Sequence, residues 1–310
     1  MNLSSITLKT NQYVVKNHAP LAHWQLRTRR IDLTRRPVLM GIVNLTPDSF
    51  SDGGRLYRGG RLDVSAAVDY ALQLENEGTT ILDLGAESTR PGSLPIGEAE
   101  ELRRLVPVVA AICAKTKVPV SVDTYRAAVA RECLATGAEI VNDISAATFD
   151  EEMVPLINET GAGVCLMHIK GTPQTMQADP RYDDVVAEVT AYLAERRNAL
   201  VAAGVIPERI VLDPGIGFSK TVEHNLRLLR ETETLHAIGQ PLMYGISRKR
   251  FLDTLTGFDH SQYPEKRLLG TLGVTQFLVS RGVQIFRVHD VAATKQTLDV
   301  DTINLLNYLD

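Results

Sequence analysis

The most visible absence in the sequence is a long apolar run. No stretch approaches the roughly 18 consecutive apolar residues that a membrane-spanning helix needs, and the first residues lack the apolar core of a secretory signal. The 310 residues contain only three cysteines, none of them in a Cys-x-x-Cys pair. We therefore expect a cytoplasmic protein with reduced thiols and no membrane partner.

A strong charge of one sign is also absent. The chain carries 33 lysines and arginines against 37 aspartates and glutamates, and its net charge is −4. Surfaces that bind nucleic acids normally hold an excess of basic residues, so a nucleic acid is not an expected partner. A composition of 44% hydrophobic and 23% charged residues is that of an ordinary folded protein.

Short apolar runs alternate with longer amphipathic segments along most of the chain. Eight runs have the pattern of strands buried on both faces, at residues 38–43, 80–84, 118–122, 139–142, 163–167, 210–212, 242–245 and 284–288. The segments that follow them have helical spacing, at residues 63–77, 98–115, 125–136, 153–159, 183–203, 222–229, 265–280 and 291–308. Eight strand–helix units predict one α/β domain, a (β/α)8 TIM barrel at residues 37–310. An open doubly wound sheet is the alternative, but no Gly-x-Gly-x-x-Gly follows the first strand.

Residues 1–36 precede the predicted barrel as an N-terminal extension. Within them, Trp24, Leu26, Ile31 and Leu33 alternate loosely with polar residues, which is typical of half-buried strands. This pattern predicts a β-hairpin that lies across the bottom of the barrel.

In a TIM barrel the active site lies at the C-terminal ends of the strands. Every predicted strand of this chain ends in polar residues, which are Asn44, Asp83, Asp123, Asn142, His168, Asp213, Ser247 with Lys249, and Arg287 with His289. One such residue is ordinary at a strand end, whereas polar residues at all of the strand ends indicate a functional site.

One group of these residues combines two carboxylates, an amide and a cation, namely Asp123, Asp213, Asn142 and Lys249. Buried carboxylates need hydrogen-bond donors, and a flat heterocycle with amino and ring N–H groups on one edge would provide them. The alternative is an internal salt bridge between Lys249 and Asp123 or Asp213, without a ligand.

A second group holds the donors that phosphate oxygens require, namely Asn44, Ser88, Thr89, Arg90, Arg287 and His289. The first and last strands of a closed barrel are neighbours, so Asn44, Arg287 and His289 are expected to converge. Asn44 with Asp48 or Asp52 has the oxygen ligands that suit Mg²⁺ beside a diphosphate. A core histidine is the alternative interpretation of His289.

Two loops carry distinctive motifs, Asn-Leu-Thr-Pro-Asp-Ser-Phe-Ser-Asp-Gly-Gly at residues 44–54 and Ser-Thr-Arg-Pro-Gly at residues 88–92. Further characteristic segments lie at residues 83–87, 121–124, 142–144, 166–168, 212–218, 247–250 and 287–290. In order and spacing these segments closely resemble the dihydropteroate synthases, a family of pterin-binding barrels. The resemblance covers the chain from about residue 38 to near its C-terminus.

The resemblance implies a transferase of folate synthesis. Such an enzyme joins 4-aminobenzoate to 6-hydroxymethyl-7,8-dihydropterin diphosphate and forms 7,8-dihydropteroate and diphosphate. It implies a pterin site of Asp123, Asn142, Met167, Asp213, Phe218 and Lys249. It also implies a diphosphate site of Asn44, Asp83, Thr89, Arg90, Arg287 and His289, with Asn44 as the ligand of Mg²⁺.

The same resemblance implies a pocket for 4-aminobenzoate, which sulfonamides also occupy, made of Phe50, Thr89, Pro91, Ser247 and Lys249. Residues 46–54 and 88–92 would be mobile loops that close over the site. The catalytic residues would be Asn44, Asp123, Lys249, Arg287 and His289.

Two other functions share parts of this pattern. A corrinoid-dependent methyltransferase domain would share the pterin residues but lack the two loop motifs, and both motifs are present. A non-catalytic paralogue would have lost a loop or an anion-binding residue, and none is lost. Family members are usually homodimers, and the apolar residues before the last strand either form such a surface or pack on the barrel; they are Leu268, Leu272, Phe277 and Leu278.

Overall fold

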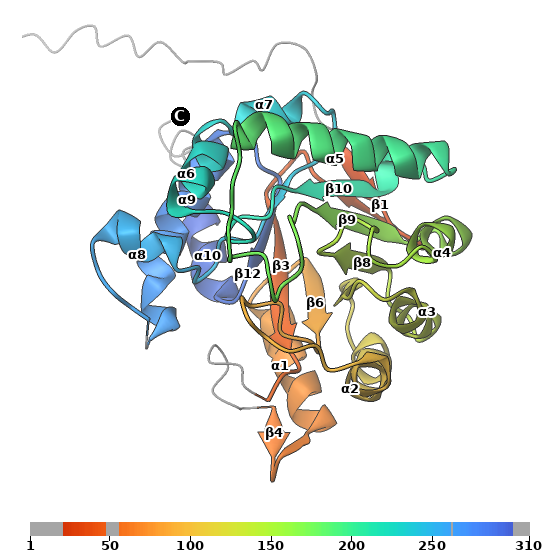
Figure 1. The fold of residues 1–310 in the computed structure, drawn as a ribbon. Coiled ribbons are helices and arrows are strands. Elements are labelled where there is room, and N and C mark those ends of the chain that lie inside the picture. Colours follow the sequence, from red (N-terminus) through yellow and green to blue (C-terminus); the bar gives the residue numbers. More distant parts are fainter. Residues whose placement is uncertain (1–20, 48–55, 262, 300–310) are drawn as a thin grey trace, which may run out of the picture.

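The computed structural model describes residues 21–47, 56–261 and 263–299. A sheet of eight strands forms its centre, with β3 (Val38–Asn44), β6 (Ile81–Gly85), β7 (Val120–Asp123), β8 (Ile140–Asp143), β9 (Gly163–Met167), β10 (Ile210–Asp213), β11 (Met243–Tyr244) and β12 (Ile285–Val288). The strands pair in parallel in the order β10-β9-β8-β7-β6-β3-β12-β11. A parallel bridge between Leu212 and Leu242 joins the two ends of this order, so the sheet closes into the predicted barrel (Figure 1).

Helices cover the outside of the barrel (Figure 1). They are α1 (Val64–Asn76), α2 (Glu98–Cys113), α3 (Ala127–Ala135), α4 (Met153–Thr160), α5 (Val185–Ala202), α6 (Val222–Arg230), α7 (Thr232–His236), α8 (Phe251–Thr256), α9 (Leu268–Ser280) and α10 (Val291–Asp299). Within the described ranges, no helix is both long and apolar enough to cross a bilayer.

Some elements differ from the sequence prediction. The pattern did not predict α7, α8 or the ribbon of β4 (Tyr57–Arg58) and β5 (Arg61–Leu62), because elements this short show no clear periodicity. The helix predicted from residue 265 begins as a 3₁₀ turn at Pro264–Arg267 and becomes α-helical at Leu268. The predicted end of the last helix, after residue 299, lies outside the described residues.

Side-chain caps explain where several of the helices begin. Asp63 precedes α1 and accepts a hydrogen bond from the N–H of Ala66 at 3.0 Å, and Asp184 caps α5 in the same way. At the start of α6, Thr221 and His224 form a reciprocal capping pair. Each cap satisfies backbone donors that the first helical turn leaves free.

The predicted hairpin is present at the bottom of the barrel. Strands β1 (His23–Gln25) and β2 (Arg30–Asp32) pair antiparallel, and Trp24 is completely buried between them and the barrel. The indole Nε1 donates to the carbonyl oxygen of Arg209 at 2.8 Å. The hairpin side chains pack against apolar residues of the barrel interior, including Val38, Ile81, Ile140, Cys165, Val211, Met243 and Ile285. The bottom is therefore filled, and polar residues of the interior can gather only at the other end.

Candidate active site

The polar strand-end residues share the inward face of the barrel with this lower core. Side chains two residues apart on a strand point to the same side. The lower core includes Ile81, Ile140, Val211 and Ile285. The residues two positions further along the same strands are, in the same order, Asp83, Asn142, Asp213 and Arg287. Each of these strands thus contributes an apolar residue to the bottom and a polar residue to the mouth.

Arg287 joins carboxylates from two other strands. Its Nε donates to Asp83 Oδ2 at 2.6 Å, and its Nη2 donates to Asp123 Oδ2 at 2.8 Å. Asn142 Nδ2 also donates to Asp83 Oδ2, at 3.2 Å. The guanidinium of β12 therefore joins carboxylates of β6 and β7 at the mouth, and Asp83 connects Asn142 of β8 to the same group.

Burial strongly affects the charges in this group. It raises the pKa of Asp123 to about 7, although the neighbouring Arg287 guanidinium opposes the shift. Burial also opposes the charge of Arg287, but Asp83 and Asp123 outweigh it and raise the pKa of the guanidinium. Asp83 Oδ1 is buried and has no hydrogen-bond partner among the described residues. An oxygen in this state is a candidate acceptor for a donor on a ligand.

Lys249 lies over the ring of Phe218. Its Nζ is 4.2 Å from the ring centroid, and it donates to the carbonyl oxygen of Ile216. Burial lowers the pKa of Lys249 to about 8, and the charge of Asp213 opposes this shift. In the part of the chain that the structure describes, Asp123 forms its salt bridge with Arg287, and neither Asp123 nor Asp213 forms one with Lys249.

Asp213 and Met167 end two neighbouring strands, where they are register partners. Asp213 Oδ1 accepts the N–H of Gly215 at 2.7 Å, and burial raises the pKa of the carboxyl. Met167 belongs to a small apolar cluster against which the Phe218 ring packs; its members are Ile144, Met167, Ile169 and Met176. A carboxyl group, a cation and an apolar wall therefore surround one part of the mouth.

Ser247 holds the ring of His289. The Ser247 Oγ lies 3.0 Å from His289 Nδ1 and accepts the backbone N–H of His289 at 3.2 Å. Burial, together with the charges of Arg248 and Arg287, holds the pKa of His289 well below its usual value. These surroundings favour the neutral form of the ring.

Arg248, between Ser247 and Lys249, has a left-handed backbone with a φ of 59°. Its guanidinium binds both oxygens of Asp290, at 2.9 and 2.6 Å. Its N–H donates to Thr271 Oγ1 at 3.1 Å. A left-handed non-glycine residue costs on the order of 1 kcal/mol, so these contacts stabilise a strained turn that sets the directions of its two neighbours.

The remaining predicted residues lie on the segment between β6 and α2, at the end of β3, or outside the described residues. Thr89 is half-buried, and Arg90 and Pro91 are exposed, on the segment between β6 and α2. Asn44 ends β3, where Gly85 is its register partner. Phe50, Asp48 and Asp52 lie outside the described residues.

A buried pair at the mouth was missed by the sequence analysis. Lys220 Nζ lies 2.9 Å from His168 Nδ1 and donates to the carbonyl oxygen of Phe218 at 3.0 Å. Burial, with a smaller effect of Lys220, lowers the pKa of His168 to about 2. The pair links the end of β9 to the segment after β10. The sequence places His168 at a strand end, but nothing in the sequence around Lys220 indicates that the two side chains meet.

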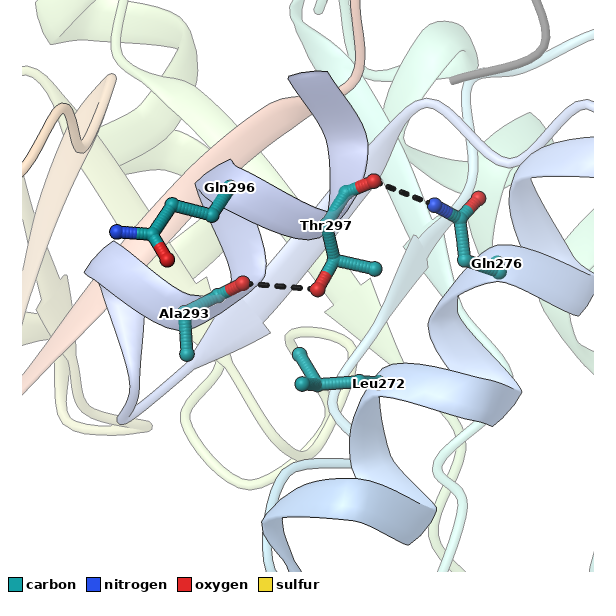
Figure 2. A pocket seen from close by; sticks show the side chains of 5 residues that line it. All are labelled: Leu272, Gln276, Ala293, Gln296 and Thr297. Carbon is teal, nitrogen blue, oxygen red and sulfur yellow. Dashed lines mark hydrogen bonds between the residues drawn. The ribbon is translucent and has the colours of Figure 1, made fainter. Parts of the chain in front are cut away.

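A separate groove of about 440 Å³ lies between α9 and α10. Figure 2 shows its lining residues, which are Leu272, Gln276, Ala293, Gln296 and Thr297. The groove is on the outer layer and not at the strand ends.

Across residues 21–47, 56–261 and 263–299, no three His, Cys, Asp or Glu side chains are grouped as a metal site.

Comparison with known proteins agrees with this geometry. A family model described as "Pterin binding enzyme" matches residues 40–289. A dihydropteroate synthase from Neisseria meningitidis serogroup B is 43% identical over 281 residues, which cover 89% of this chain and 95% of the relative. The chain belongs to the dihydropteroate synthase family. The Escherichia coli K12 dihydropteroate synthase is 42% identical and covers 87% of this chain and 92% of its own length. The chain is accordingly a transferase of alkyl groups.

Solved dihydropteroate synthases have the same fold. The Yersinia pestis enzyme in a sulfonamide complex matches with a TM-score of 0.84 and 37% identity, over 92% of this chain and 99% of that one. The Xanthomonas albilineans enzyme with 4-aminobenzoic acid matches with a TM-score of 0.82 and 40% identity, over 92% and 98%. The same enzyme with 7,8-dihydropteroate has a TM-score of 0.79 and 38% identity, again over 92% and 98%.

Proposed function

We propose that this member of the family condenses 6-hydroxymethyl-7,8-dihydropterin diphosphate with 4-aminobenzoate to 7,8-dihydropteroate and diphosphate. The observation that carries the proposal is the group of Arg287, Asp83, Asp123 and Asn142 at the barrel mouth, where a cation and hydrogen-bond acceptors lie together. The relatives support the two ligands, because one was solved with 4-aminobenzoic acid and with 7,8-dihydropteroate.

The pterin would bind among Asp123, Asn142, Met167, Asp213, Phe218 and Lys249. Asp213 and Asn142 would accept from its amino and ring N–H groups, and Lys249 would donate to its carbonyl group. Phe218 and Met167 would provide the apolar surface that a flat ring needs. The contact of Lys249 with the Phe218 ring supports this arrangement, because it holds the ammonium beside that surface.

The diphosphate would bind near Asn44, Thr89, Arg90, Arg287 and His289. The Ser247 hydroxyl accepts the N–H of His289, so its own hydrogen is free to reach Nδ1. The ring N–H then lies on Nε2, where it can donate to a phosphate oxygen. Asp83 would act on the diphosphate through Arg287, since the two are directly bonded.

Mg²⁺ is the expected cofactor, and Asn44 is its proposed protein ligand. Mg²⁺ prefers oxygen ligands and commonly uses one or two side chains together with substrate phosphates. An amide oxygen at the end of β3 fits this pattern. The ion would neutralise charge on the departing diphosphate.

4-Aminobenzoate would lie beside Phe50, Thr89, Pro91, Ser247 and Lys249. The Yersinia pestis relative was solved with a sulfonamide drug, so we propose that sulfonamides compete for this pocket.

Loss of diphosphate leaves a cationic methylene conjugated with the pterin ring, and Asp123 would stabilise that charge. The neutral aromatic amine can then attack without a strong general base. Closure of residues 88–92 would exclude water.

The test uses purified protein, both substrates and Mg²⁺, with dihydropteroate and diphosphate as the measured products. Removing the ion with a chelator should stop turnover, and adding it back should restore turnover. Arg287→Lys should weaken binding of the pterin diphosphate by about 10- to 100-fold, the effect of losing charge-assisted hydrogen bonds. Binding of the pterin alcohol without diphosphate should change much less. No product from the wild-type protein would refute the proposed function.

We also propose a cytoplasmic homodimer in which residues 1–36 extend a barrel domain of residues 37–310. The described cysteines are free, which fits a reducing compartment. Leu269 on α9 is 79% exposed, and Leu255 and Phe277 are exposed nearby on α8 and α9, which supports a dimer surface there. Leu278 is completely buried in the barrel core and is not part of that surface.

A further inference from the structure

The segment between β9 and α5 crosses the mouth of the barrel. We call residues 170–180 the strap; in Figure 1 they belong to the green segment that leads from β9 to α5. On one side, the N–H of Gly92 donates to the carbonyl oxygen of Pro173 at 3.2 Å, and Gln174 Nε2 donates to that of Ser93 at 3.0 Å. The strap is thus bonded to the loop that carries Thr89 and Arg90.

On the other side, the strap is bonded to the segment after β10. Gln177 Nε2 donates to the carbonyl oxygen of Gly217 at 3.0 Å, and the N–H of Lys170 donates to Ser219 Oγ at 2.9 Å. Gly217 and Ser219 flank Phe218, whose ring lies under Lys249. The strap therefore contacts both loops that the proposed substrates would use.

The strap has its own ordered turn and an apolar underside. The N–H groups of Thr175 and Met176 both donate to the carbonyl oxygen of Thr172, at 3.0 and 2.8 Å. Met176 is buried in the cluster that contains Met167, and the Phe218 ring packs against that cluster. Buried apolar contacts below and hydrogen bonds at both edges would keep the strap in one position.

We propose that the strap positions the two substrate loops, with Gln177 acting on the pterin side and Gln174 on the 4-aminobenzoate side. Both are positioning residues, because each acts through a backbone carbonyl of a loop. This inference rests on the proposed function. It predicts separable effects, since each glutamine bonds to a different loop and both are exposed.

The test compares Gln174→Ala and Gln177→Ala with Gln73→Ala. Gln73 is a matched control, because it is an exposed glutamine on the outer helix α1 whose amide donates to Glu77, the residue after that helix, at 2.7 Å. Gln177→Ala should raise the Kd of the pterin alcohol, which lacks the diphosphate, about 3- to 10-fold, the effect of one lost hydrogen bond, while the Michaelis constant for the aminobenzoate substrate stays near wild type. Gln174→Ala should raise that Michaelis constant by a similar factor and leave the Kd of the pterin alcohol unchanged, since the alcohol has no diphosphate to contact Thr89 and Arg90. Gln73→Ala should change neither constant.

Thermal unfolding of all three variants distinguishes positioning from general support. Exposed side chains of this kind contribute little to global stability, so the Tm values should agree with wild type. The inference is overturned if the pterin Kd and the aminobenzoate Michaelis constant stay at wild-type values in Gln174→Ala and Gln177→Ala. It is also overturned if either of these variants raises the two constants together and lowers the Tm. A wild-type protein that forms no dihydropteroate would instead count against the proposed function.

Discussion

Arg287 bonds to carboxylates from two other strands of the candidate site. Removing its charge would leave two buried carboxylates, Asp83 and Asp123, without their cation. Unpaired buried charges are costly, typically about 3–5 kcal/mol when one partner of a pair is removed. Stability and anion binding therefore depend on the same side chain, and for that reason Arg287→Lys is a better probe of binding than a neutral substitution.

Gly217 offers a test of how closely Lys249 is confined. Its φ is +81°, and an added Cβ would lie 2.8 Å from Lys249 Cδ. Gly217→Ala should therefore displace the lysine and weaken pterin binding by at least about 10-fold, in addition to about 1 kcal/mol of backbone strain. Gly239→Ala is the matched control, because its φ is +84° and a Cβ there would meet nothing within 4 Å. Equal pterin affinity in both variants would contradict the proposed position of Lys249.

His168 predicts a pH dependence of stability. Its pKa is lowered from 6.5 to about 2 in the fold, chiefly by burial, and its Nδ1 already contacts Lys220 Nζ. Below pH 6.5 the unfolded chain binds more protons at this ring than the folded protein, so stability falls as the pH decreases. The loss is about 1.4 kcal/mol per pH unit.

His168→Gln removes this titration. Urea unfolding at several pH values should show that the difference in unfolding free energy between wild type and variant shrinks below pH 6.5. Buried carboxyls with raised pKa values act in the opposite direction in both proteins, so they cancel in the difference. A constant difference over this range would show that His168 is protonated in the fold.

Among the elements, the hairpin and the strap cover opposite ends of the same barrel. The hairpin fills the bottom with large apolar side chains, whereas the strap joins loops at the mouth through hydrogen bonds. Burial of apolar area is the stronger stabilising effect, at roughly 25 cal/mol per Å². The hairpin should therefore govern stability, and the strap should govern the positions of loops.

Trp24→Ala tests this division. The side chain is completely buried, so its removal should cost about 3–5 kcal/mol of unfolding free energy. Turnover of the folded fraction should stay near wild type, because the hairpin lies at the end away from the candidate site. Trp24→Phe should lose less, since it keeps most of the ring and loses the hydrogen bond to Arg209. Urea unfolding measures the loss of stability, and steady-state assays measure turnover. A folded Trp24→Ala protein with weak pterin binding would contradict the claim that the hairpin governs stability and not the candidate site.

At the scale of the whole molecule, the proposed dimer is tested by Leu269→Lys. A charged side chain at this exposed apolar position would be desolvated in an interface, so the variant should sediment as a monomer while the wild type sediments as a dimer. Ile206→Lys is the control, because Ile206 is 42% exposed and lies just before β10 at the bottom of the barrel. A dimeric Leu269→Lys protein would exclude this face as the interface.

Much of the fold could be predicted because its signals are local. Residues 163–167 were predicted as a strand, and β9 is Gly163–Met167. Elements of five or six residues, α7 and α8, were missed, because one or two helical turns carry no usable periodicity. For the site, the resemblance assigned Arg287 to the diphosphate and Asp123 to the pterin, whereas the structure bonds the two together.

By itself, the sequence determined where the strands of the barrel lie, which end of each of them is polar, and which family the loop motifs resemble. These properties depend on neighbours along the chain and on side-chain spacing. Only the tertiary structure decided that Arg287 bonds to Asp83 and Asp123, from which it is separated by 204 and 164 positions. Only the closed barrel brought the strap against both substrate loops. Such pairings follow from the distances between strands and loops in space, and no local pattern encodes those distances.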